Sequence, residues 1–187
     1  MSDTTFIITR RRTSRLSIRI TKEGEVRVSA PRYVSSREIN AFVESHQDWI
    51  EKALARVARQ QEGRDAFYTQ LDLSTPDLRK EAVAKLDAIV APLAKKYSDL
   101  MGVSPAGISY RRSMTRWGSC NPRTHRITLS TYLLLLPDWC IEHVVVHELA
   151  HLLEANHGPR FYAIMDRYFP RWKEARRATA NMIGKSK

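Results

Sequence analysis

The feature that most constrains the fold of this chain is a pair of histidines four residues apart, His147 and His151. Residues with this spacing share one face of an α-helix, with Cβ atoms about 5–6 Å apart. The preceding segment, 137–146, resembles the start of a helix, so we expect one helix to carry both side chains. Two imidazoles placed in this way can reach the same Zn²⁺ ion at Zn–N distances of about 2.0–2.1 Å.

A third histidine, His157, follows six residues after His151. A continuing helix would rotate His157 away from the face that carries the first two. The segment 156–159, Asn-His-Gly-Pro, instead favours a turn that ends one helix and begins the next. A catalytic zinc ion needs three protein ligands and one open position. The sequence therefore predicts a zinc site formed by His147, His151 and His157.

Two carboxylates remain open as alternatives to His157 as the third ligand. Glu154 would take that place if the helix continued beyond the first two histidines. Glu174 is the other candidate, although the segment 173–177 has the pattern of a solvated helix face. We favour His157 over both.

Two more side chains of the predicted helix bear on the site. Glu148 directly follows His147 and would lie at the edge of the metal-facing surface, where it can hold a water molecule on the metal. His143 precedes His147 by one helical spacing. A fourth protein ligand would close the site, so we expect His143 to support the ligands or to lie at the surface.

With these residues in place, the chain resembles the YgjP-like metallopeptidases, relatives of the WLM and SprT-like families. The resemblance is clearest from about residue 111 to residue 176. Its motifs are His-Glu-Leu-Ala-His-Leu at 147–152, Asn-His-Gly at 156–158 with Phe161, Arg-Trp-Gly-Ser-Cys at 116–120, and Pro-Arg-Trp at 170–172.

The resemblance implies a zincin-like α+β fold, zinc held by the three histidines, and Glu148 as the general base. The chain departs from the family pattern in two places. Tyr162 stands where the family usually has tryptophan, and the stretch after Gln60 is shorter than in typical members. Neither departure touches the predicted metal ligands.

The segment 116–119 is predicted to contribute to substrate binding. Gly118 would allow a second backbone to approach, as a strand beside an active cleft requires, and a peptide could add to that strand. Trp117 packed over a tight bend is the equal alternative, and Arg116 is expected at the surface rather than at an oxyanion. Cys120 is not expected to act as a nucleophile. The predicted substrate-binding residues are Arg116, Trp117, Gly118 and Ser119.

Hydrophobic patterning predicts two parts. Residues 1–60 should form a β-hairpin–helix unit, with strands at 6–10, 16–20 and 26–30 and a helix capped by Ser35 or Ser36. His46 lies in the apolar stripe of that helix, so we expect it in the core or partly buried.

The second predicted part is a metallopeptidase core over residues 76–187, in which the active-site helix packs on a small sheet. The polar stretch from Gln60 to Pro76 reads as a linker between the two parts. A helix should begin at Thr75 and be kinked or split at Pro92. The two parts are expected to form one compact domain overall.

Composition limits the class of protein. A chain of 187 residues with 43% hydrophobic content can bury a core, and no stretch reaches the roughly 18 apolar residues of a membrane span. The N-terminus lacks the pattern of an export signal, and two cysteines suggest free thiols, so we expect a cytoplasmic protein. The net charge of +11 favours anionic partners.

We therefore expect a cytoplasmic zinc metallopeptidase that acts on a peptide or protein. Two alternatives remain. One is a metal-dependent hydrolase of nucleotide phosphoanhydrides, which the absence of a Gly-rich phosphate loop disfavours. The other is a basic nucleic-acid-associated protein with a structural metal, which would bind weakly and with a strong salt dependence. The oligomeric state stays open.

Overall fold

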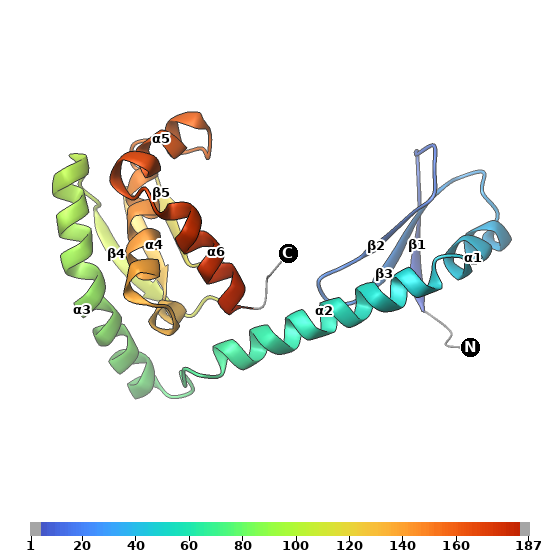
Figure 1. Ribbon diagram of the computed structural model, residues 1–187, viewed down its shortest axis with the longest axis horizontal. Coiled ribbons are helices and arrows are strands. Elements are labelled where there is room, and N and C mark those ends of the chain that lie inside the picture. Colours follow the sequence, from blue (N-terminus) through green and yellow to red (C-terminus); the bar gives the residue numbers. More distant parts are fainter. Residues whose placement is uncertain (1–4, 184–187) are drawn as a thin grey trace. The chain divides into compact units, whose positions relative to one another are not determined.

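The structure is a computed structural model that describes residues 5–183. Runs of three strands and runs of helices follow one another along the chain (Figure 1), which confirms the predicted α+β class. The chain divides into two compact units, Met1–Gly63 and Arg64–Lys187.

The first unit is built on a three-stranded sheet. Its strands are β1 (Phe6–Arg11), β2 (Ser17–Ile20) and β3 (Val26–Pro31), in the order β1-β3-β2. Strands β2 and β3 form the predicted antiparallel hairpin, with Gly24 in the turn at a φ of 83°, while β1 runs parallel to β3. Helix α1 (Ser36–Glu44) is capped by Ser35, one of the two predicted residues, in a capping box with Glu38.

Two expectations for the helical part of this unit are wrong. The predicted single stripe is interrupted, because α1 ends at Glu44 and α2 (Gln47–Tyr68) begins after a turn. His46 lies in that turn and is exposed instead of buried. Its ring Nδ1 is 2.8 Å from the carbonyl oxygen of Phe42. His46 therefore makes a local hydrogen bond in the turn, whereas the apolar pattern of the sequence suggested packing in the core.

The predicted linker from Gln60 to Pro76 is also largely wrong, since α2 continues to Tyr68. Gly63 within this helix costs about 1 kcal/mol relative to alanine. Phe67 and Tyr68, which follow it, are buried in the core of the second unit. Burying two aromatic side chains outweighs that cost, so a polar segment is helical.

The second unit begins with α3 (Pro76–Met101), which is capped by Thr75 as expected and ends at Gly102 in the left-handed conformation. Pro92 does not split this helix, which is continuous. Its side chain is exposed, and the opposite face is anchored by a row of buried residues: Ala82, Leu86, Val90, Ala94, Tyr97 and Met101.

A second small sheet follows, with strands β4 (Gly107–Arg111), β5 (Gly118–Asn121) and β6 (Arg126–Ser130) in the order β4-β6-β5. Strand β4 is parallel to β6, and β5 is antiparallel to β6. A short 3₁₀ segment, η1 (Thr131–Leu135), leads into α4 (Asp138–Ala150), followed by α5 (Pro159–Tyr168) and α6 (Trp172–Met182).

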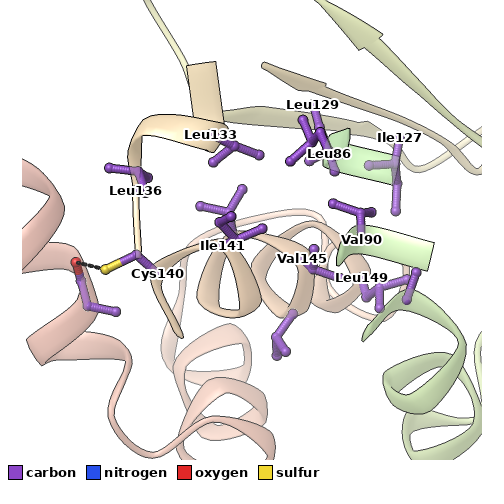
Figure 2. Packing of buried hydrophobic residues seen from close by; sticks show 14 of the residues in the cluster. Leu86, Val90, Ile127, Leu129, Leu133, Leu136, Cys140, Ile141, Val145 and Leu149 are labelled. Atoms are coloured by element: carbon purple, nitrogen blue, oxygen red, sulfur yellow. Dashed lines mark hydrogen bonds between the residues drawn. The ribbon is translucent and has the colours of Figure 1, made fainter. Parts of the chain in front are cut away.

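Helix α4 lies at the centre of this unit, next to α3, α5, α6 and β5 (Figure 1). Figure 2 shows its apolar residues facing those of α3 and β6: Ile141, Val145 and Leu149 opposite Leu86, Val90, Ile127 and Leu129. Each fully buried aliphatic side chain contributes about 1.5–3 kcal/mol relative to an exposed one. The predicted packing of the active-site helix on a small sheet is confirmed.

Cys140 is buried at the start of α4, with its Sγ 4.0 Å from the carbonyl oxygen of Ala175 in α6 (Figure 2). Cys120 and Cys140 are both free thiols. Among residues 5–183, no helix is both long enough and apolar enough to cross a membrane.

Candidate metal centre

The three histidines of interest are placed by the end of α4 and the turn that follows it. His147 lies in the last turn of α4, and His151 is its C-terminal capping residue. The chain then leaves the helix and re-enters α5 at Pro159, with Gly158 as the residue before the first turn. This break and restart agree with the expectation from the sequence, and His157 lies just before the restart.

The imidazoles of these residues converge. One ring nitrogen from each of His147, His151 and His157 lies within 4.8 Å of the other two. Nε2 of His157 is 3.0 Å from Nε2 of His147. Two ligands of a tetrahedral zinc ion with bonds of 2.0–2.1 Å are about 3.3 Å apart, so this donor set fits a zinc ion in size and chemistry.

The alternative carboxylates lie outside this cluster. In the described part of the chain, the three histidines are the one group whose ligand atoms converge in this way. Glu154 accepts a hydrogen bond from the backbone N–H of Asn156 at 3.3 Å, and Glu174 accepts one from Arg171 at 2.8 Å. The structure therefore favours His157 over both, although the ligand set stays a prediction.

Two contacts orient the rings. His151 Nδ1 lies 3.2 Å from the carbonyl oxygen of Glu154. A carbonyl can only accept, so Nδ1–H donates and Nε2 is left to bind a metal ion. The fully buried ring of Phe161 lies 4.6–4.9 Å from all three imidazoles, centroid to centroid. Both contacts limit rotation of the rings.

Two of the imidazoles, those of His147 and His151, are held in the neutral form that metal binding requires. Burial lowers the pKa of His147 to about 3, and the charges of neighbouring histidines add to this effect. Burial is also the main cause that lowers the pKa of His151. At neutral pH these rings therefore present lone pairs rather than positive charges.

The side chain of Glu148 lies against Gly118 of β5 and is only 4% exposed. Burial raises the pKa of its carboxyl to about 8, partly opposed by the positive charge of Arg116. Its Oε2 atom has no hydrogen-bond partner among the described residues. A buried carboxylate oxygen without a partner is costly, which fits a group whose partner is a ligand.

His147, Glu148 and His157 line a pocket of about 420 Å³, to which β5, α4, α5 and α6 contribute. Its wall consists of Trp117, Gly118, His143, Val144, His147, Glu148, His157, Phe161, Tyr162, Trp172 and Arg176.

A family model for the metallopeptidase domain of YgjP-like proteins matches residues 14–74 and 74–181. The chain belongs to the YgjP-like metallopeptidase family. The match covers both compact units and includes the histidine cluster. This confirms the resemblance inferred from the motifs, and the chain is a metallopeptidase.

Two solved structures are similar to this YgjP-like protein. The metallopeptidase zymogen abylysin of Pyrococcus abyssi is 24% identical, with a TM-score of 0.46, over 49% of this chain and 92% of that one. The zymogen jannalysin of Methanocaldococcus jannaschii is 16% identical, with a TM-score of 0.44, over 49% of this chain and 94% of that one. A comparison with curated proteins gave no match.

Of the four residues predicted to bind substrate in this YgjP-like metallopeptidase, Trp117 and Gly118 line the pocket. Ser119 lies in β5 outside the lining, and Arg116 is exposed, as expected. The ring of Trp117 also packs against Phe67, 6.2 Å away between centroids. Trp117 therefore both lines the pocket and packs in the core, and its part in substrate binding stays a prediction.

Six pocket residues are not among the predicted site residues: His143, Val144, Phe161, Tyr162, Trp172 and Arg176. His143 is buried, so the surface alternative for it is wrong. Tyr162 and Trp172 stack with ring centroids 4.8 Å apart at 18°. Arg176 belongs to the segment that was interpreted as a solvated face. The sequence signal for its place in the pocket wall is its spacing of four residues from Trp172, because residues four apart share one side of a helix.

Proposed function

We propose that this metallopeptidase binds Zn²⁺ through His147, His151 and His157 and hydrolyses peptide bonds with Glu148 as the general base. One observation carries the proposal: three imidazole nitrogens converge beside a buried carboxylate that has an unpartnered oxygen. Three protein ligands with an open fourth position are the donor set of a catalytic rather than a structural zinc ion.

A zinc ion held there would polarise the scissile carbonyl and lower the pKa of the attacking water molecule. Glu148 takes the proton from that water and passes it to the leaving amine. The low-dielectric surroundings suit this role, because burial raises the pKa of its carboxyl and makes the carboxylate a stronger base.

The proposed path of the peptide runs along β5. This strand is paired on one side with β6 and is an edge of its sheet within residues 5–183. An extended peptide can add to such an edge through main-chain hydrogen bonds. Gly118 begins β5 and lines the pocket next to Glu148, so a bound strand would pass close to the general base.

The test combines zinc content and turnover. After extensive dialysis we expect one zinc ion per chain in the wild type and in Glu148→Gln, but peptide hydrolysis only in the wild type. His157→Ala should lose zinc, whereas Glu154→Ala and Glu174→Ala should retain it. Full activity of Glu148→Gln would refute the mechanism, and zinc retained in His157→Ala would refute the ligand set.

The nucleotide-hydrolase and nucleic-acid alternatives rest on the net charge of +11 alone. Phosphate release from nucleoside triphosphates, measured beside peptide cleavage on the same preparation, separates the first from the proposal. Steep salt-dependent nucleic-acid binding without turnover would favour the second.

A further inference from the structure

Arg176 brings a positive charge into the wall of the pocket. It lies on α6, one helical turn after Trp172, and lines the same space as His143 and His147. Its charge acts on both histidines: burial is the main cause that lowers their pKa values, and the guanidinium adds to the effect. Arg176 is therefore close to the predicted metal centre, although it is exposed to solvent.

The charge of Arg176 is not neutralised by the protein. Within residues 5–183, it has no ion pair or hydrogen bond to an acidic side chain. Arg171, the residue before the first turn of α6, in contrast pairs with Glu174 at 2.8 Å. A guanidinium beside a cation site opposes binding of the cation, because like charges repel. A negatively charged group bound beside Arg176 offsets this repulsion.

The neighbouring aromatic pair suggests what kind of molecule carries the anion. Tyr162 and Trp172 form a stacked apolar surface in the same pocket wall as Arg176. Apolar walls with a few convergent polar groups are typical of ligand pockets, in which the polar groups fix the orientation of the ligand. A peptide portion can pack on the aromatic rings while its charged group reaches the guanidinium.

We propose that Arg176 binds a carboxylate of the peptide substrate and thereby selects acidic or C-terminal segments. This inference rests on the proposed peptidase function. Arginine suits the task because its planar fork donates two parallel hydrogen bonds to a carboxylate. The carboxylate is either the side chain of an acidic residue or the free C-terminus of the peptide.

The experiment compares zinc-loaded wild type, Arg176→Gln and a matched control, Arg177→Gln. Arg177 is the adjacent, exposed arginine of α6 and does not line the pocket. The probes are acetylated hexapeptides in which each position in turn carries Glu or Gln, each made with a free and an amidated C-terminus. Cleavage is followed by mass spectrometry, and kcat and KM are measured separately.

We expect the wild type and Arg177→Gln to prefer one class of carboxylate peptide. Arg176→Gln should lower kcat/KM for that class by about 10- to 100-fold, mainly through KM, as for loss of a hydrogen bond to a charged group. Neutral peptides should change by less than about twofold. The Glu/Gln pairs and the free/amidated pairs tell the two sources of carboxylate apart.

The proposal is overturned if the wild type shows no preference for carboxylates, or if Arg176→Gln slows charged and neutral peptides equally. If the wild type cleaves no peptide, the proposed function fails. The role of Arg176 is then tested separately by measuring peptide binding. Dye-labelled peptides are then titrated into Glu148→Gln with and without Arg176→Gln. Tighter binding of the carboxylate form that requires Arg176 supports the proposal, and equal or absent binding of both forms overturns it.

Discussion

Gly118 of β5 lies against Glu148 of α4 so closely that a side chain at position 118 has no room. A Cβ atom added to Gly118 would be 2.5 Å from Oε1 of Glu148 and 2.7 Å from its Cδ and Cγ atoms. Real Cβ atoms do not approach other atoms this closely. The strand and the proposed general base therefore fix each other's position.

Replacing Gly118 by alanine should displace the carboxylate of Glu148 and lower kcat/KM by about 100-fold, the effect of misplacing a catalytic group by about 1 Å. Zinc content should be unchanged, because the change does not touch the histidines. Overpacking of this kind also destabilises a protein by about 1–3 kcal/mol.

A double-mutant cycle checks the cause. Gly118→Ala should cost less stability in a Glu148→Ala background, where the clashing atoms are gone, than in the wild type. Thermal unfolding of zinc-free protein gives the four values. An equal cost in both backgrounds would show that the two residues do not interact.

Zinc should stabilise the folded chain through the three histidines. A ligand that binds only the folded state at about 1,000 times its Kd contributes about 4 kcal/mol. Addition of zinc should therefore raise the unfolding temperature of the wild type, and this shift should vanish in His157→Ala.

The control for this experiment is His125→Asn. His125 is exposed in a turn, outside the histidine cluster, and has a φ of 54°, which asparagine tolerates better than alanine. It should keep the full shift in unfolding temperature. Loss of the shift in this control, or its persistence in His157→Ala, would argue for nonspecific zinc binding.

Phe161 should matter for both stability and metal affinity. Its ring is fully buried against the three imidazoles. Truncation to alanine should destabilise the protein by about 3–5 kcal/mol and weaken zinc binding, because the rings gain freedom. Phe161→Leu fills much of the volume and should retain more of both, as measured by unfolding and by zinc titration. If Phe161→Ala is destabilised but binds zinc as tightly as the wild type, Phe161 contributes to stability and not to metal affinity.

The histidine cluster could be predicted because its information is local. The spacing of His147 and His151 fixes a shared helix face, and the turn residues before Pro159 determine where the helix ends. The two ends of α3 can be predicted in the same way, because Thr75 and Gly102 carry the capping signals. Each of these features depends on residues within a few positions of one another.

The rest of the pocket depends on tertiary contacts that periodicity does not encode. Arg176 and Arg177 have the same sequence pattern, yet only Arg176 lines the pocket. The helical end of α2 was missed for a similar reason. Gly63 and polar neighbours suggest a linker, but burial of Phe67 and Tyr68 decides the outcome. Whether such side chains line the pocket or join the core is known only when the elements that pack against them are known.

The thiol of Cys120 offers a pH-dependent test of the surroundings of Glu148. Burial, and next the negative charge of Glu148, raise the pKa of Cys120 to about 11. A raised thiol pKa means less of the reactive thiolate at any lower pH. Alkylation should therefore be slow at pH 8 compared with a free thiol, whose pKa is about 8.5.

The measurement uses zinc-free Cys140→Ala, in which Cys120 is the one remaining cysteine. Its iodoacetamide rate should rise about tenfold per pH unit up to pH 10, whereas a small thiol levels off near its pKa of about 8.5. Glu148→Gln removes the neighbouring charge and should speed the reaction at pH 8. A plateau below pH 9 would contradict the raised pKa of the thiol, and no change in Glu148→Gln would contradict the effect of the Glu148 charge on it.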